Sequence, residues 1–446
     1  MHPARNSLTS YALAIVFGFA VLQPGLVGQE KAENWKALLN RAQASFNSLK
    51  SEETIALLGR VLEILPQGKD RMEAQIKVYE LRGAAYELAR KPELALQDAQ
   101  AVLGFIKKRD EGKGNQGWIR PMLRAAKLMD QTRQREPASS MYRDALELSE
   151  GAQENRLTLS LEIFHLCARG YGRIGDWQSA SKTLITYIER LEEKHGKNHA
   201  DLVGPLKNLA RYQRNAKAFE EAIKSLNRWV KIYELSKGKD SPSTATGLRA
   251  IAECHIALQS YAAAEKALDR WQMVLERVTK KHPEIVYVLQ LRAQIDRLQK
   301  KYLDESGHIV ESAKRMAALP KPDYTALGEF NRLLAVSYRQ QAKYDLAKIA
   351  IDECMAFFKK KLRATDPQRL MGQLERGHVS FAIGAMDAAK KDYDAVLRSW
   401  RKLAGDEHRI LIAPLEALLT LAQKTKDETR AQELSLWIKK IEAKTK

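Results

Sequence analysis

The feature that most constrains the fold of this chain is an internal repeat with a period of about 42 residues. A small residue stands at the middle of most of the helical patterns, and successive marks lie 41 to 43 residues apart. Because this register is kept over ten copies, it predicts an array of similar units that pack against their neighbours in sequence. The marks are Ala42, Gly83, Ala126, Ala168, Ala210, Ala252, Ala293, Ala335, Gly377 and the larger Leu419.

Two further residue types recur at fixed distances after the mark, an aromatic residue and an alanine, and the unit they describe consists of two helices. In the fourth unit, apolar residues spaced by three and four stand on both sides of Gly175-Asp176, a pattern typical of two amphipathic helices joined by a turn. One hairpin cannot bury its own apolar face, so the hairpins must stack. Twelve residues after the mark stand Ala95, Ala138, Ala180, Ala222, Ala264, Ala347, Ala389 and Ala431, with Thr54 and Glu305 as exceptions, and nine residues after it stand Trp177, Phe219, Tyr261, Tyr302 and Tyr344.

These offsets resemble the tetratricopeptide repeat, most clearly in Arg82-Gly83-Ala84-Ala85-Tyr86 followed by Ala95. The period is longer than the usual 34 residues and is similar to that of kinesin-light-chain repeats, whose linkers carry a turn like His282-Pro283. The resemblance implies an all-α, right-handed α-solenoid of about ten stacked hairpins. It also implies a protein-binding scaffold with a concave groove lined by first helices. HEAT and armadillo arrays, with periods of ~40 to 47 residues, are the alternative.

We expect residues 29–446 to form a single solenoid of this kind. Three of its repeats depart from the pattern and are interpreted as irregular or capping units. These degenerate repeats lie near residues 32–66, 285–320 and 410–446.

The first 28 residues have the pattern of a signal peptide. Arg5 precedes an apolar stretch from Tyr11 to Leu22, which is short for a membrane span of about 20 residues. We therefore expect export, to a bacterial periplasm or the medium, with cleavage near Gly28. A membrane anchor formed by an uncleaved segment is the alternative.

No motif in the sequence predicts catalysis or a cofactor. Two segments, Gly170 to Gly175 and Gly112 to Gly117, spell GxGxxG, but neither follows a strand in a βαβ unit, as dinucleotide binding requires. The three cysteines are far apart and stand among apolar positions, so we expect small buried side chains rather than disulfides. The chain is expected not to be an enzyme.

One histidine pair has the spacing of a zinc motif. His195 and His199 are four residues apart, and Asp201 follows closely. Gly196 and Asn198 between them indicate a linker instead of a helix. We therefore expect a solvated loop with capping roles and no metal site.

Positive charge is the main functional signal. The formal net charge is +19, and residues 203–446 hold 45 basic against 30 acidic side chains. Several cations recur at fixed offsets from the marks, so stacked hairpins would align them as a ladder that could bind carboxylates. They could equally be solvated residues or form ion pairs inside the solenoid. The candidate groove ladder is Lys207, Arg211, Arg214, Arg249, Arg297, Arg332 and Arg339.

The repeats and this ladder predict an exported interaction scaffold that binds an acidic peptide or protein in the groove. The alternative is a basic adaptor held to anionic lipid, envelope polymer or nucleic acid by its general positive field. Nucleic acid is the least favoured of these partners, because the chain has no basic arm or RNA-binding aromatic motif and carries the pattern of an export signal. An unrecognised enzyme is a weaker alternative.

Overall fold

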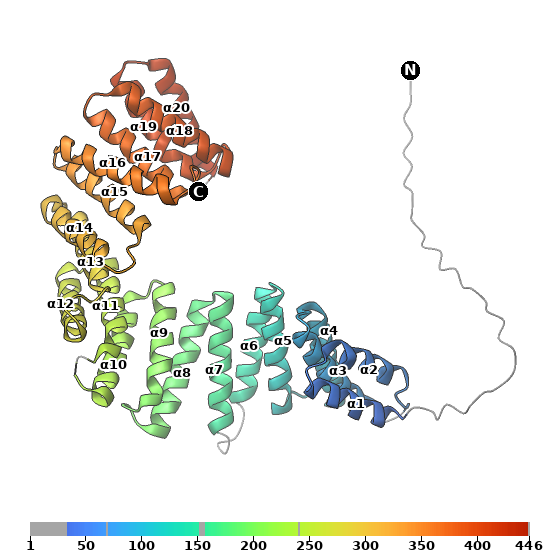
Figure 1. Ribbon diagram of the computed structural model, residues 1–446. Coiled ribbons are helices and arrows are strands. Elements are labelled where there is room, and N and C mark those ends of the chain that lie inside the picture. The colour runs from blue at the N-terminus through green and yellow to red at the C-terminus, as the bar shows by residue number, and fades with distance from the viewer. Residues whose placement is uncertain (1–33, 68–69, 151–156, 240, 445–446) are drawn as a thin grey trace, which may run out of the picture. The chain divides into compact units, whose positions relative to one another are not determined.

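The computed structural model describes residues 34–67, 70–150, 157–239 and 241–444, and this part of the chain is helical throughout with no strand. The expected signal peptide lies outside the described residues. Helices follow one another as antiparallel pairs (Figure 1). They group into two compact units, which divide between residues 141 and 142. That residues 29–446 form one continuous solenoid stays a prediction.

The first unit holds five helices and the start of a sixth, α6, within which the division falls. The strongest packing is within pairs, α1 with α2 and α3 with α4. The helices are α1 (Trp35–Asn47), α2 (Ser51–Glu63), α3 (Asp70–Leu88), α4 (Pro92–Arg109), α5 (Ile119–Gln131) and α6 (Arg135–Glu150).

The second unit continues with seven hairpins, and each second helix also packs on the first helix of the next hairpin. Short 3-10 turns precede three of the first helices: η3 (Ala200–Leu202), η4 (Pro242–Thr244) and η5 (Arg409–Leu411). The hairpins are α7 (Leu157–Ile174) with α8 (Trp177–His195), α9 (Val203–Asn215) with α10 (Phe219–Lys237), α11 (Ala245–Ala257) with α12 (Tyr261–Val278), α13 (Ile285–Leu298) with α14 (Tyr302–Ala317), α15 (Tyr324–Gln340) with α16 (Tyr344–Lys361), α17 (Pro367–Ala382) with α18 (Met386–Ala404), and α19 (Ile412–Lys424) with α20 (Glu428–Lys444).

The recurring small residues lie inside the hairpins, as the sequence predicted. In the pair α7 and α8, both Ala168 and Ala180 are fully buried. The turn between these helices is made by Gly175, whose φ of +87° favours glycine, and by Asp176, whose carboxylate accepts from the backbone N–H of Ser179. Small side chains at these positions let the two helices approach closely.

The exceptions to the alanine pattern are also buried, and each side chain has one local polar partner. Thr54 donates from its hydroxyl to the carbonyl of Lys50 at 2.8 Å. Glu305, with no exposed side-chain area, forms an ion pair with Arg297 of the preceding helix. The degenerate repeats therefore still form hairpins, and one of them replaces an alanine contact with a buried ion pair.

One position in the linkers between hairpins recurs as a cap. Its side chain accepts a hydrogen bond from the backbone N–H two residues later, which satisfies a donor at the start of the next helix. Histidine, serine and aspartate all do this, at intervals of 41 to 43 residues. The caps are His199, Ser241, His282, Asp323, Asp366 and His408.

All three cysteines are free and buried, as expected from their apolar surroundings. Burial raises the pKa of the Cys254 thiol to about 11, and that of Cys167 and of Cys354 to about 12. None of the described helices has the length and apolar character needed to cross a bilayer.

The packing at Gly377 gives a stability prediction. A Cβ at this position would lie 2.5 Å from a ring carbon of the buried Tyr393, so Gly377→Ala is expected to lower the free energy of unfolding by about 1–3 kcal/mol. The control is Gly307→Ala on α14, where a Cβ meets nothing within 4 Å. Since alanine favours helix, this control should gain about 0.5–1 kcal/mol. Urea midpoints measure both, and equal shifts in the two variants would contradict the packing argument.

A double-mutant cycle tests the buried ion pair. Arg297→Ala leaves the Glu305 carboxylate buried without its partner, which we expect to cost about 3–5 kcal/mol. Adding Glu305→Ala restores the residue found at the equivalent positions Ala264 and Ala347, so the double variant should recover most of the loss. Denaturation midpoints of the three variants provide the measurement. If the double variant is no more stable than Arg297→Ala, the unpaired Glu305 carboxylate is not the cause of the lost stability.

Candidate functional site

The first helices α7 and α9 border a pocket of about 500 Å³. Three arginines contribute to its wall, and no acidic side chain does. It is lined by His165, Arg169, Gly172 and Arg173 from α7, Trp177 from α8, and Asn208, Arg211, Tyr212 and Asn215 from α9.

A second pocket, of about 310 Å³, lies between α9 and α11. It shares Asn208 and Arg211 with the first pocket, so the two hollows meet along one helix. We call the surface formed by both pockets the first-helix groove. The second pocket is lined by Lys207, Asn208, Ala210, Arg211, Arg214, Leu226, Trp229, Thr246, Arg249, Ala250 and Glu253.

Four of the seven residues of the candidate ladder lie in this groove, but they are not electrostatically equivalent. Glu253, the acidic residue of its lining, is paired with both Arg214 and Arg249, the latter at 2.8 Å from guanidinium Nε to carboxylate oxygen. Lys207 lies over the ring of Trp229 at 5.6 Å, and Arg211 over that of Tyr212 at 5.1 Å. Arg211 also reaches the Tyr212 hydroxyl, at 3.4 Å.

Lys207 and Arg211 therefore keep their charge uncompensated by any carboxylate among the described residues. An aromatic face holds each cation in place without neutralising it. Such cations can form charge-assisted hydrogen bonds with an incoming carboxylate. They are the two ladder residues best placed to bind a ligand.

The other three ladder residues lie outside these two pockets, in ion pairs between helices or within one. Arg297 pairs with the buried Glu305, as described above. Arg332 donates two hydrogen bonds to Glu329, at 2.8 and 2.6 Å. Arg339 of α15 binds Glu375 of α17, at 2.8 and 3.3 Å, and burial raises the pKa of that carboxyl group despite the pairing. These three arginines have structural partners within the solenoid.

Sequence reasoning missed the contribution of α7 to the groove. Arg169 stands one place after its mark, at the same offset as Arg211 in the next hairpin, and this shared offset is the signal that could have identified it. Burial, and then the charge of Arg169, lower the pKa of His165, which favours the neutral imidazole. Arg173 donates to the hydroxyl of Tyr142 at 3.0 Å.

Two asparagines add neutral hydrogen-bonding groups to the groove. Asn208 and Asn215 lie on α9, two turns apart, and both line the larger pocket. Each side-chain amide carries both donors and an acceptor, the same combination as a peptide group. The groove therefore offers amides for a polypeptide backbone beside cations for carboxylates.

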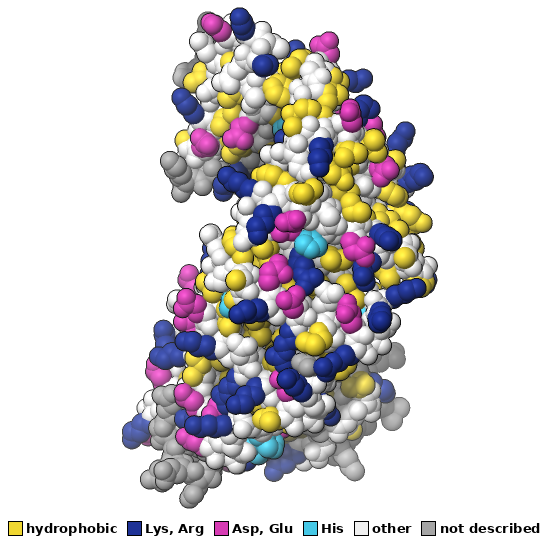
Figure 2. Space-filling model, turned by 90° about the vertical axis from the view of Figure 1, so that its left-hand side faces the viewer, with side chains coloured by type: hydrophobic (Ala, Val, Ile, Leu, Met, Phe, Trp, Pro, Cys, Tyr) yellow, Lys and Arg dark blue, Asp and Glu magenta, His cyan; other side chains and the backbone are white. Residues whose placement is uncertain are grey.

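Charge is mixed on the one face of the molecule drawn in Figure 2. Lys and Arg side chains are interspersed with Asp and Glu in Figure 2, and hydrophobic side chains gather on the upper right part of this face.

Comparison with known proteins extends to the fold alone. No family model and no curated protein matches the sequence. Among solved structures, the apo form of the quorum sensor NprR from B. thuringiensis is 11% identical over 84% of this chain and 98% of its own, with a TM-score of 0.47. A signal transduction ATPase of Pyrococcus horikoshii with a tetratricopeptide repeat sensor is 16% identical over 83% of this chain and 54% of its own, with a TM-score of 0.46.

A tetratricopeptide repeat protein from Parabacteroides merdae is 15% identical over 67% of this chain and 98% of its own, with a TM-score of 0.40. Because these TM-scores are below 0.5, no role is carried over from those proteins. In the residues that the structure describes, the fold itself rests on twenty helices in pairs, on their buried alanines and on a period of about 42 residues. This part of the chain is an all-helical repeat structure, similar in fold to tetratricopeptide repeat proteins.

Proposed function

We propose that this chain is a non-enzymatic scaffold that binds an acidic peptide segment of a partner protein in the first-helix groove. The observation that carries the proposal is the pair Lys207 and Arg211, two cations that line one groove without a carboxylate partner. Both side chains are exposed, and two like charges four residues apart on a helix repel each other weakly. A ligand carboxylate would offset this repulsion.

The groove also suits an extended chain. Two pockets joined along α9 provide room for several successive side chains, and Asn208 and Asn215 can exchange hydrogen bonds with peptide groups between them. Backbone bonds of this kind give affinity, while the cations select the acidic sequence.

Charge reversal tests the proposal. The probe is a fluorescein-labelled ten-residue peptide of alternating Glu and Ala with a free C-terminal carboxylate, and its Lys-for-Glu counterpart is the ligand control. We expect Lys207→Glu combined with Arg211→Glu to weaken binding of the acidic peptide at least ~10-fold, equivalent to ~1.4 kcal/mol, in fluorescence anisotropy at physiological salt. The lysine peptide should not bind the original chain.

The matched variant is Lys359→Glu with Lys360→Glu, which changes the net charge equally at two exposed lysines on α16, outside the groove. Its affinity should stay within about twofold of the original. If both double variants lose affinity equally, the general positive field binds the peptide. That result would favour the alternative of a basic adaptor to anionic lipid, envelope polymer or nucleic acid.

We further propose, from the sequence pattern of residues 1–28, that the protein is exported to a bacterial periplasm or the medium. Expression in a bacterial host should place the full chain outside the cytoplasm, with a mature N-terminus near Gln29 on N-terminal sequencing. A chain lacking residues 2–28 is the control and should stay in the cytoplasm. A full chain that fractionates with the membrane and keeps its N-terminus would instead support the anchor.

A further inference from the structure

The linker between α8 and α9 contains more chemistry than capping requires. At the cap position His199 accepts from the backbone N–H of Asp201 at 3.3 Å, as Ser241 and His408 do from their own partners. The Asp201 carboxylate takes no part in that bond. Nor does His195, the last residue of α8, so the cap explains neither of these side chains.

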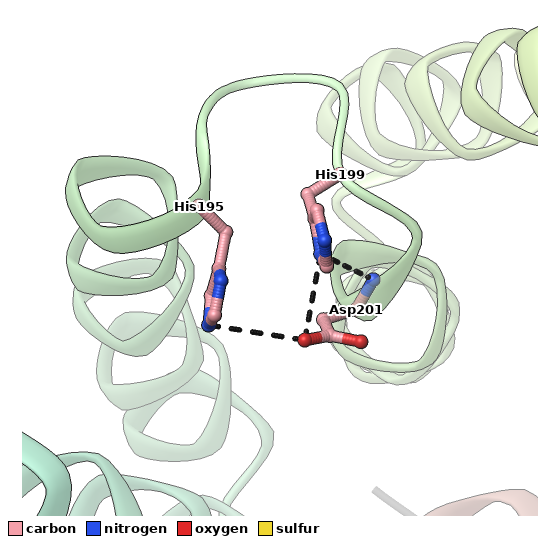
Figure 3. Close-up of side chains that lie close together, drawn as sticks. All are labelled: His195, His199 and Asp201. Carbon is pink, nitrogen blue, oxygen red and sulfur yellow. Dashed lines mark hydrogen bonds and ion pairs between the residues drawn. The ribbon is translucent and has the colours of Figure 1, made fainter.

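The structure brings these three side chains together (Figure 3). Asp201 Oδ2 lies 3.8 Å from His195 Nε2 and 3.4 Å from His199 Nδ1. The two imidazole rings stack with their centroids 4.7 Å apart and their planes 20° from parallel. One possible ligand atom from each of the three residues lies within 4.8 Å of the other two. Among the described residues, no other set of three His, Cys, Asp or Glu side chains meets this condition.

These separations are too long for good hydrogen bonds, which span ~2.7–3.2 Å. They match another geometry better. Zinc binds imidazole nitrogen and carboxylate oxygen at ~2.0–2.2 Å in a tetrahedron, so neighbouring ligand atoms stand roughly 3.3–3.6 Å apart. The two distances around Asp201 Oδ2 are 3.4 and 3.8 Å. An imidazole nitrogen binds a metal in the plane of its ring, so the two stacked rings must turn out of their stack for both nitrogens to reach one ion.

The linker is held in this conformation from a third helix. Arg228 of α10 pairs with Glu192 in the last turn of α8, and it donates to the backbone carbonyl of Lys197 at 3.0 Å. One guanidinium thus fixes both the end of α8 and the turn that returns His199 to it. The site is also open, with the side chain of His199 43% exposed, so water can complete the coordination.

We propose that His195, His199 and Asp201 bind a divalent zinc ion that clamps the end of α8 to the start of the next hairpin. His195 provides Nε2 and Asp201 provides a carboxylate oxygen. His199 provides Nδ1, which then no longer accepts the 3.3 Å hydrogen bond from the backbone N–H of Asp201. Both imidazoles bind in the neutral form. The site is independent of the first-helix groove, because none of the three residues lines either pocket.

Comparison of the linkers explains why spacing alone predicted only a solvated loop. Two zinc-binding histidines four residues apart normally lie one turn apart on a single helix. Here Gly196, with a φ of +87°, ends α8 between the two histidines. The turn, rather than the helix, places the second histidine over the first. At the other histidine caps, the residue four places earlier is Val278 or Ala404, so those linkers lack the additional imidazole.

The test is a calorimetric titration of the full, untagged and chelator-treated chain with zinc chloride. We expect one ion per chain, with an affinity in the micromolar range, and visible absorption typical of tetrahedral Co²⁺ when cobalt replaces zinc. His195→Gln and Asp201→Asn should each weaken binding at least ~10-fold. His199→Ser should do the same while keeping the fold, because Ser241 shows that serine serves as the cap.

The matched control is His408→Ser, which makes the same cap substitution at a linker without the other two ligands. Its zinc affinity should equal that of the original chain, and circular dichroism should show equal helix content in all four variants. The proposal is overturned if no saturable one-ion binding occurs. It is also overturned if the three ligand variants bind zinc as the His408→Ser control does, because the ion would then be held by other side chains.

Discussion

The close packing of two helices at a small residue is the contact on which the rest of this structure depends. Ala168 is fully buried in the hairpin of α7 and α8, and a Cβ at Gly377 would meet the ring of Tyr393. These positions therefore leave little more than room for a hydrogen or a methyl group. Because this contact repeats about every 42 residues, each hairpin presents its first helix in a similar way. Residues at equal offsets, such as Arg169 and Arg211, thereby line the same pocket. What such an array binds therefore depends on which side chains occupy the repeat positions that face solvent.

The fold could be predicted from the sequence because its determinants are local and periodic. Alanines at fixed intervals and apolar residues spaced by three and four specified the hairpins, and Gly175-Asp176 marked a turn. Even Glu305, where the alanine rule fails, kept the hairpin. Its partner Arg297 lies only eight residues earlier.

The site could be predicted only in part, because two of its candidate arginines are paired with carboxylates of neighbouring hairpins. Glu253 lies 39 residues after Arg214 and Glu375 lies 36 residues after Arg339, so a single repeat does not reveal which arginine is neutralised. Offsets placed seven cations on a common ladder. Three-dimensional packing divided them into paired arginines and the pair Lys207 and Arg211, for which aromatic rings replace carboxylates.

The buried cysteines give this array built-in reporters of local opening. Cys167, Cys254 and Cys354 belong to three different hairpins, and each thiol is enclosed and has a raised pKa. Since the thiolate is the reactive form, a thiol-specific reagent modifies such a residue only after its hairpin opens to solvent. The natural sequence can therefore report, from three separate labelling rates, whether these hairpins unfold together or one at a time.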